Sequence, residues 1–250
     1  MKLLGIIFAL CTLSACSHTV KFRASHFAIP ITSEKQWGGQ IAISGSSVTK
    51  VTLVNDYTTN PPTRTNVWIN RDSDLDVDDS LFAGAFSAIG VDGNLSVLNS
   101  LDVYLESSLV GLRWQFLNHG STSETVVAAI QAGVANRSES ETITSGGNSS
   151  SAKSNIRTNQ LGISVGYQYP NVVPYISYVE EKHEVTTDIT NTGGDYSYKD
   201  NGTHKYIALG LTKRLKDLTY AIEYTRVIAK WDRSTEETQG ALAARVGFAW

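Results

Sequence analysis

The fold is decided by QGALAARVGFAW, residues 239–250. From Leu242 onward every second residue is apolar, and this set ends in two aromatic residues, Phe248 and Trp250. The residues between them are small, apart from the charged Arg245. Because a β-strand points alternate side chains to opposite faces, the stretch predicts a strand with one apolar face and one small, polar face. An apolar face that ends in aromatic residues suits a strand that faces lipid.

The same twelve residues resemble the C-terminal insertion signal of bacterial outer-membrane β-barrel proteins, whose last residue is usually Phe or Trp. The resemblance implies that the chain lies in the outer membrane with lipid around it. It also implies that the barrel-assembly machinery inserts the chain, with Phe248 and Trp250 as the assembly signal.

The composition fits a barrel and argues against two other classes. The 250 residues carry 21 Lys and Arg against 24 Asp and Glu, so no basic surplus indicates nucleic acid as a partner. No apolar run reaches the ~18 residues that would predict a transmembrane helix. The length is sufficient for one barrel or for one to two soluble domains.

The N-terminus predicts export and a lipid anchor. Residues 1–15 combine a positive charge, an apolar core and small residues near the end, which is typical of a signal peptide. Residues 13–16, LSAC, resemble the lipobox of bacterial lipoproteins, and this resemblance implies lipidation of Cys16. Ser17 resembles the pattern of lipoproteins sent to the outer membrane. A plain secretory signal that is cut near Ala15 is the alternative.

Residues 17–33 have no clean period and contain Pro30, so we interpret residues 16–33 as a periplasmic tether. The predicted organisation is a lipoprotein signal peptide at residues 1–15, this tether, and an outer-membrane barrel at residues 34–250. In this interpretation the N-terminus lies in the periplasm.

Apolar residues alternate with small or polar ones from residue 36 to the end of the chain, with turn residues between the segments. The pattern predicts an all-β fold, a single antiparallel up-and-down barrel of about twelve strands. The weakest strand is at residues 65–70, and a ten-stranded barrel with one N-terminal segment outside it is the alternative. Asp92-Gly93-Asn94 predicts a hairpin turn, and residues 136–154 and 188–202 predict loops.

A soluble β-sandwich would show the same alternation. Two features favour the membrane barrel. The apolar faces repeatedly end in aromatic residues, and the opposite faces are mostly Gly, Ala, Ser and Gln, which suit a lumen better than an exposed surface.

A two-residue turn at Ser107-Ser108 would place Asp102 opposite Arg113 on the face away from lipid. The polar and charged residues predicted to face the lumen are Asp102, Glu106, Arg113, Gln131, Gln160, Glu223 and Arg245. Buried charges need a partner or water. These groups therefore either fill a narrow barrel with ion pairs or line a water-filled pore, and the number of strands does not decide between the two.

An acidic run has carboxylates at every second residue, which resembles the opening of a D-x-D-x-D calcium loop. The run lacks the Gly of the sharp turn and the distal Glu of such loops, so a solvated extracellular loop is the plainer interpretation. The candidate metal ligands are Asp72, Asp74, Asp76 and Asp78.

Some outer-membrane barrels are enzymes, among them phospholipase A, the omptin proteases and the lipid A deacylase. Each needs a His near a Ser or Asp at the outer rim. His183 and His204 flank residues 188–202 and could meet at that rim near Glu181. No nucleophile singles them out, and His119-Gly120-Ser121 is better interpreted as a polar turn.

The leading hypothesis is a non-enzymatic outer-membrane barrel without a cofactor. It would be either a narrow porin-like channel for small solutes or ions, or a structural component of the membrane. One alternative is a closed barrel whose surface loops serve binding or adhesion. The other is an outer-membrane hydrolase with a His at the rim.

Overall fold

The computed structural model describes residues 16–33, 36–64, 68–70, 88–121, 124–145 and 148–250. In the part of the chain that it describes, no helix is long and apolar enough to cross a membrane. The strands are β1 (His18–Arg23), β2 (Gly39–Ser46), β3 (Val48–Val54), β4 (Trp68–Asn70), β5 (Ala88–Leu98), β6 (Leu101–Glu106), β7 (Leu109–Leu117), β8 (Thr125–Ser145), β9 (Asn148–Gln168), β10 (Val172–Asn191), β11 (Gly194–Leu215), β12 (Leu218–Trp231) and β13 (Glu237–Ala249).

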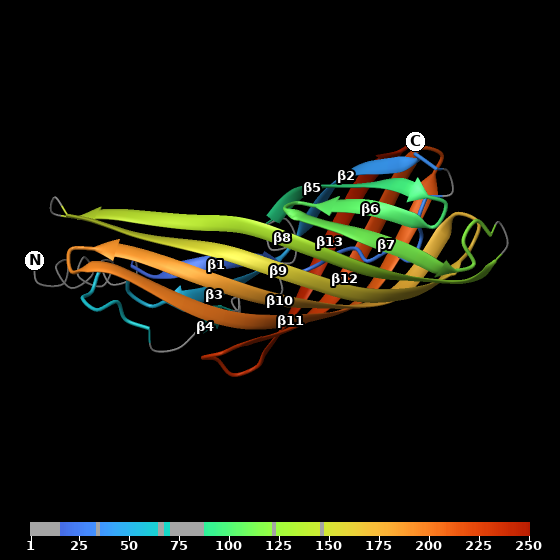
Figure 1. The fold of residues 1–250 in the computed structure, drawn as a ribbon. Coiled ribbons are helices and arrows are strands. Elements are labelled where there is room, and N and C mark those ends of the chain that lie inside the picture. Colours follow the sequence, from blue (N-terminus) through green and yellow to red (C-terminus); the bar gives the residue numbers. More distant parts are fainter. Residues whose placement is uncertain (1–15, 34–35, 65–67, 71–87, 122–123, 146–147) are drawn as a thin grey trace, which may run out of the picture.

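Ten strands close into an antiparallel barrel (Figure 1). Their order around the ring is β2-β5-β6-β7-β8-β9-β10-β11-β12-β13, and β13 pairs with β2 to close it. At this seam the backbone N–H of Trp250 donates to the carbonyl oxygen of Gly39 over 3.1 Å. The all-β barrel predicted from the alternation is confirmed, and the C-terminal stretch forms its closing strand.

The ring has two strands fewer than the preferred prediction of twelve and matches the alternative of ten. The two segments expected in the ring near residues 49–57 and 65–70 contain β3 and β4, which form a separate three-stranded sheet with β1 in the order β1-β3-β4. β3 lies outside the ring because side chains on both of its faces are buried. A lipid-facing strand would expose every second side chain instead.

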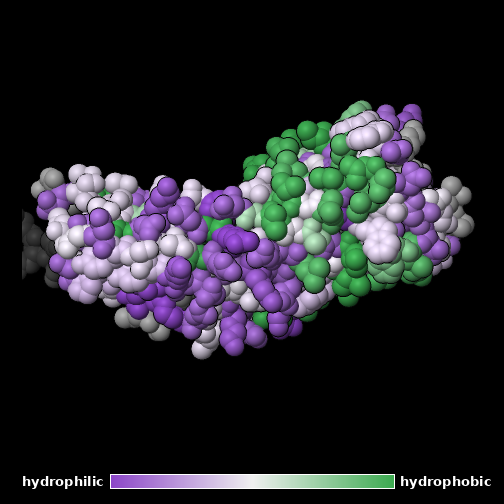
Figure 2. Space-filling model, viewed as in Figure 1, coloured by the Kyte–Doolittle hydropathy of each residue, from purple (hydrophilic) through white to green (hydrophobic). Residues whose placement is uncertain are grey.

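The outer face of the barrel is apolar, and Figure 2 shows it as a belt at one end of the molecule. Ile43, Leu161 and Leu209 illustrate it, with 64%, 65% and 62% of their surface exposed. The inward residues of the same strands are buried and mostly small or polar. So much exposed apolar surface would be unfavourable in water, and therefore the belt marks the part of the barrel that lies in a membrane.

Four strands continue far beyond this belt. β8, β9, β10 and β11 have 21, 21, 20 and 22 residues, about twice the ~9–11 that a strand needs to cross a membrane. We call their outer halves, residues 136–145, 148–159, 180–191 and 194–205, the extension. Its outer surface is hydrophilic (Figure 2). Most of the two segments predicted as loops therefore forms regular strands. They pair continuously with their neighbours and bury inward side chains such as Ala152 and Ile189, which outweighs the Ser, Gly and Asn around them.

The inner face of the extension is covered by β1 and β3 (Figure 1). Each layer contributes apolar side chains to a common core. Two sheets that pack face to face outside the membrane are held together by such a core. The members of this core are Val20, Phe22, Val51, Leu53, Val54, Tyr57, Ala152, Ile156, Val185, Ile189 and Trp231.

Residues 24–33, which we call the plug, lead from β1 through the lumen to the start of the barrel. Ala24, Phe27 and Ala28 are at most 1% exposed and pack against residues of the barrel wall. The structure thus places residues 18–33 inside the molecule, whereas the sequence suggested a free tether. A segment without a period can still be buried when its polar groups find partners in the wall.

Cys16 lies at the opposite end of the molecule from the C-terminus. Its carbonyl oxygen accepts a hydrogen bond from the N–H of Tyr57, whose own carbonyl accepts one from Asn191 at the tip of β10. Trp250 pairs with Gly39 at the other end of the barrel. The plug therefore carries the chain across the whole membrane-spanning part.

Two local predictions had opposite outcomes. Asp102 lies opposite Arg113, as the turn at Ser107-Ser108 predicted. The hairpin at residues 92–94 is wrong, because these residues lie within β5 and Gly93 pairs with both neighbouring strands. Their polar side chains serve contacts inside the barrel and do not form a turn.

We predict that Leu53→Ala, in the core beneath the extension, lowers the free energy of unfolding by about 2–4 kcal/mol, because it leaves a buried cavity. Leu209→Ala on the lipid-facing surface is the matched control and should cost clearly less. Urea unfolding of the protein refolded in detergent measures both. Equal losses in the two variants would contradict the buried position of β3.

Candidate functional site in the plugged lumen

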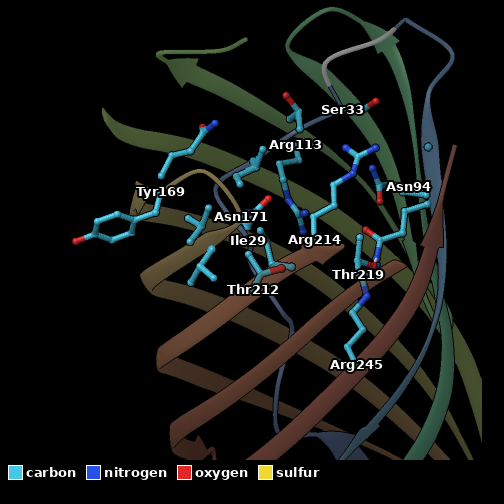
Figure 3. A pocket seen from close by; sticks show the side chains of 18 of the residues that line it. Ile29, Ser33, Asn94, Arg113, Tyr169, Asn171, Thr212, Arg214, Thr219 and Arg245 are labelled. Carbon is cyan, nitrogen blue, oxygen red and sulfur yellow. Dashed lines mark hydrogen bonds between the residues drawn. The ribbon is translucent and has the colours of Figure 1, made fainter. Parts of the chain in front are cut away.

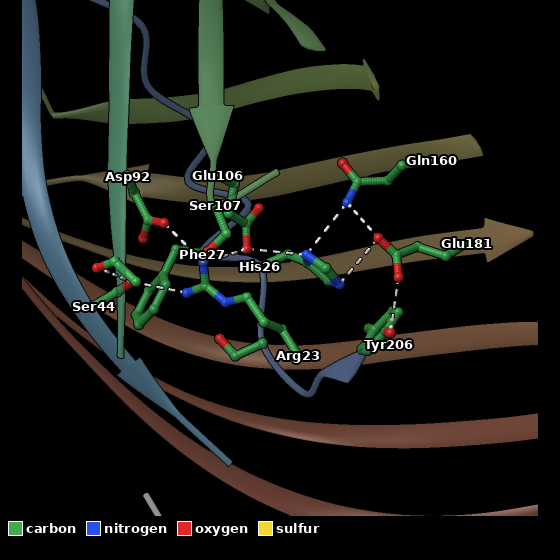
Figure 4. A network of polar contacts seen from close by, with 12 residues as sticks. Arg23, His26, Phe27, Ser44, Asp92, Glu106, Ser107, Gln160, Glu181 and Tyr206 are labelled. Carbon is green, nitrogen blue, oxygen red and sulfur yellow. Dashed lines mark hydrogen bonds and ion pairs between the residues drawn. The ribbon is translucent and has the colours of Figure 1, made fainter. Parts of the chain in front are cut away.

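The plug is attached to the barrel wall by a series of charged and polar contacts (Figure 4). At its start, Nη1 of Arg23 donates to Oδ1 of Asp92 over 2.8 Å, and Nη2 donates to Oγ of Ser44 over 2.8 Å. Arg23 also lies 3.5 Å from a carboxylate oxygen of Glu106. Charge-assisted hydrogen bonds of this kind are stronger than neutral ones. Arg23 therefore fixes the junction between β1 and the plug.

His26 lies between two carboxylates of opposite walls. Its Nδ1 is 3.1 Å from Oε1 of Glu106, and its Nε2 is 3.5 Å from Oε1 of Glu181. Gln160 and Tyr206 each donate a hydrogen bond to Glu181, over 3.1 and 3.0 Å. A cationic His26 would balance both carboxylates in a place where water is scarce, and it would bridge β6 to β10 across the lumen.

The next carboxylate of the wall, Glu223, is also satisfied from the plug. Ser25 donates its hydroxyl to Oε1 over 2.5 Å, and Tyr175 donates to Oε2 over 2.8 Å. Thr225 adds a hydrogen bond of 3.1 Å. Four wall carboxylates thus have a partner in the plug or beside it: Asp92, Glu106, Glu181 and Glu223.

All seven side chains expected to face the lumen lie inside the ring, each at most 7% exposed: Asp102, Glu106, Arg113, Gln131, Gln160, Glu223 and Arg245. Asp102 and Arg113 are opposite each other but form their hydrogen bonds with other residues. Asp102 accepts from Asn94 over 2.7 Å, and Arg113 donates to Gln131 over 3.2 Å.

The other expected positions are divided between surface and undescribed parts. Phe248 and Trp250 are 50% and 53% exposed on the lipid-facing side. Cys16 is half-buried. The acidic run with Asp72, Asp74, Asp76 and Asp78 lies outside the described residues.

His183 and His204 do come together near Glu181, with ring centroids 4.6 Å apart. They are fully buried beneath Phe22 and do not lie at an open rim. Together with Glu181 they could present ligand atoms to a metal ion. The fit is incomplete, because Nε2 of His204 already accepts a hydrogen bond from Trp231 over 3.1 Å. We therefore assign these residues to the packing beneath the extension, where their rings contact Phe22 and Trp231.

A Ser–His–Glu arrangement joins β1 to the extension. Nε2 of His18 is 2.8 Å from Oγ of Ser154, and its Nδ1 is 3.3 Å from Oε2 of Glu141. This is the geometry of an activated nucleophile. His18 and Ser154 are completely buried, however, so a substrate could not reach the hydroxyl. The arrangement instead holds β1 against β8 and β9 through these side-chain contacts.

The sequence does not predict the contacts of the plug, because residues 17–33 have no clean period and suggest a tether. One signal was present in the sequence. His18, Val20 and Phe22 alternate with Thr19 and Lys21, which is the pattern of a short strand. The buried set is the first of these, as such a strand would require.

No family model and no curated protein matches the sequence. Among solved structures, the N-terminal β-barrel domain of Pseudomonas aeruginosa OprF is 10% identical, with a TM-score of 0.32, over 86% of this chain and 98% of that chain. Ail of Yersinia pestis is 9% identical, with a TM-score of 0.35, over 86% and 100%. The outer-membrane protease OmpT of Escherichia coli is 7% identical, with a TM-score of 0.39, over 85% and 93%. The assignment of the fold rests on the strand pairing of this chain.

We predict that lowering the pH from 7 to 5 weakens the attachment of β1. Burial lowers the pKa of His18 below its usual value although Glu141 lies beside it. The unfolded chain therefore takes up the proton first, so that stability is present above about pH 6.5 and is lost as the pH falls below it. Amide hydrogen exchange of β1, corrected for the intrinsic rate, measures the effect.

His18→Gln should show a smaller loss of protection between the two pH values. His119→Gln, in a turn at the other end of the barrel, should keep the full pH dependence of wild type. An unchanged pH dependence in His18→Gln would show that this imidazole does not control β1.

Proposed function

We propose that this chain is a bacterial outer-membrane barrel with a closed lumen, which presents its extension at the cell surface as a binding platform. The observation that carries the proposal is the plug, which fills the lumen and hydrogen-bonds to the carboxylates of its wall. A narrow porin-like channel would need this space for water. The filled lumen therefore favours the closed-barrel hypothesis over the channel.

The extension supports a role in binding. At about 3.3 Å per residue, the thirteen residues from Val179 to Asn191 reach roughly 40 Å beyond the apolar belt along the strand. Its polar outer surface and its apolar core make it a rigid structure, which preserves binding energy better than mobile loops do. The buried position of His183 and His204 gives no support to the hydrolase hypothesis.

The proposal also assigns an orientation. Outer-membrane barrels close with their C-terminal strand ending on the periplasmic side, and this chain resembles them at that strand. Trp250 then faces the periplasm, and Cys16 and the extension face outward. This orientation replaces the expectation of a periplasmic N-terminus. Lipidation of Cys16 stays a prediction, and an acyl group there would lie at the outer tip.

Conductance tests the closed lumen. We expect the wild-type protein to give no discrete current steps in planar bilayers. A variant in which residues 24–33 are replaced by Gly and Ser residues of equal number should give steps, because the chain connection remains while the side chains that fill the lumen are lost. Heat-modifiable gel migration verifies that the variant folds. Regular steps from the wild-type protein would overturn the proposal.

Cysteine labelling tests the orientation. In intact cells, a membrane-impermeant maleimide should modify Lys182→Cys, whose side chain is 72% exposed on the extension. Asp217→Cys, in the turn next to the C-terminal strand, should react only after the outer membrane is permeabilised. The wild-type chain serves as the background control. The reverse pattern would place the extension in the periplasm and would remove the surface-binding role.

A further inference from the structure

A second feature of the lumen lies at the end that carries Trp250. Below the plug, the barrel contains a cavity of about 180 Å³ that opens to this end (Figure 3). Residues of the plug form its floor, including Ile29 and Thr32, and strand ends of the barrel form its wall. The volume is enough for a small polar group with a few waters.

Arg245 lines this cavity and has incomplete hydrogen bonding within the described part of the chain. Its side chain is 7% exposed, its Nε has no hydrogen bond, and no described residue forms an ion pair with it. Asp92 and Glu106 act on Arg245 electrostatically but form no ion pair with it among the described residues. A buried guanidinium without a directly bonded anion is unfavourable, since burial removes its hydration without replacing it. This position therefore calls for an acceptor from outside the chain.

The carboxylates of the lumen do not supply that acceptor, because other groups occupy them. Asp92 is bonded to Arg23, Glu223 to Ser25 and Tyr175, and Asp102 to Asn94. The backbone N–H of Ser33 also points to Asp102, at 3.3 Å. Arg245 thus differs from the other lumen charges, which are all held within the protein.

The rest of the described lining is also suited to an anion. It contains Arg113 and Arg214 besides Arg245, and neither Asp nor Glu. Arg113 uses Nε for Gln131 and Nη2 for the carbonyl oxygen of Phe27, 3.5 Å away. Gln40 and Asn94 each donate one amide N–H within the protein, to Thr219 and to Asp102, and each keeps a second N–H. The hydroxyl of Thr219, which accepts from Gln40, is a further donor in the lining.

We propose that this cavity is a binding site for a small oxyanion, a carboxylate or a phosphate group, held by Arg245 and Arg113. Guanidinium groups match both anions because their planar N–H groups can donate two parallel hydrogen bonds. In the proposed orientation the ligand enters from the periplasm. The plug closes the far side of the cavity, so the anion is retained and is not passed through the barrel.

The test is a titration of the full-length protein, refolded in detergent, with sodium phosphate and with sodium acetate at constant ionic strength. Intrinsic fluorescence reports binding, because Trp250 lines the mouth of the cavity. The wild-type protein should show a saturable response to at least one of the two anions. The two arms distinguish a phosphate-bearing ligand from a carboxylate-bearing one.

Arg245→Gln should weaken this binding at least tenfold. Arg226→Gln, which removes an exposed arginine from the outer face of the neighbouring strand β12, should leave it unchanged. In urea without added anion, Arg245→Gln should be as stable as wild type or more stable, because it loses no internal partner. A structural ion pair would give the opposite result.

Equal saturation by Arg245→Gln and wild type would overturn the site, and so would the absence of a saturable response to either anion, which would indicate a hydrated cavity only. Conductance and surface labelling do not depend on anion binding. Failure of this site is therefore distinguishable from failure of the closed-barrel proposal.

Discussion

The structure depends on one electrostatic constraint, the neutralisation of carboxylates inside a narrow lumen. Asp92, Glu106, Glu181 and Glu223 all point inward and are at most 6% exposed. Ionised groups cannot stay there without partners, because the lumen offers little water. The wall arginines Arg113 and Arg245 also face the lumen, but among the described residues neither forms an ion pair with these carboxylates. The N-terminal segment supplies Arg23 and His26, together with the hydroxyl of Ser25.

This constraint connects the membrane-spanning barrel to the extension. The segment that neutralises the lumen continues directly into β1, which covers the inner face of the extension beside β3. Loss of the contacts at Arg23 would thus free both the plug and the end of β1. The lumen and the surface platform are therefore parts of one structure, and a ligand at the extension would act on a body that is fixed by charges in the membrane.

Much of the barrel could be predicted from the sequence, because every membrane-spanning strand must alternate apolar, lipid-facing residues with lumen-facing ones. The turn at Ser107-Ser108 and the closing strand at residues 239–250 followed from that period alone. The inward direction of Glu223 and Arg245 followed from it as well. These predictions needed only local alternation and the requirement that one face meets hydrocarbon.

The remaining features depend on contacts between distant segments. The alternation in β3 predicts a lipid-facing strand, but β3 packs under strands that lie more than ninety residues away in sequence. The plug has no hydrophobic period because its side chains bond to and pack against different groups of the barrel wall. Asp92, Gly93 and Asn94 have turn chemistry, yet their side chains serve Arg23 and Asp102 inside the ring. Such partners become visible only when the topology is known.

The central claim is that residues 24–33 lie inside the barrel in the native protein. NMR spectroscopy of the isotopically labelled protein in lipid nanodiscs tests it most directly. The account predicts nuclear Overhauser effects between the ring of Phe27 and the methyl groups of Ala221 and Ala243, which belong to the same buried cluster. Random-coil chemical shifts for residues 24–33, with no such effects, would contradict it.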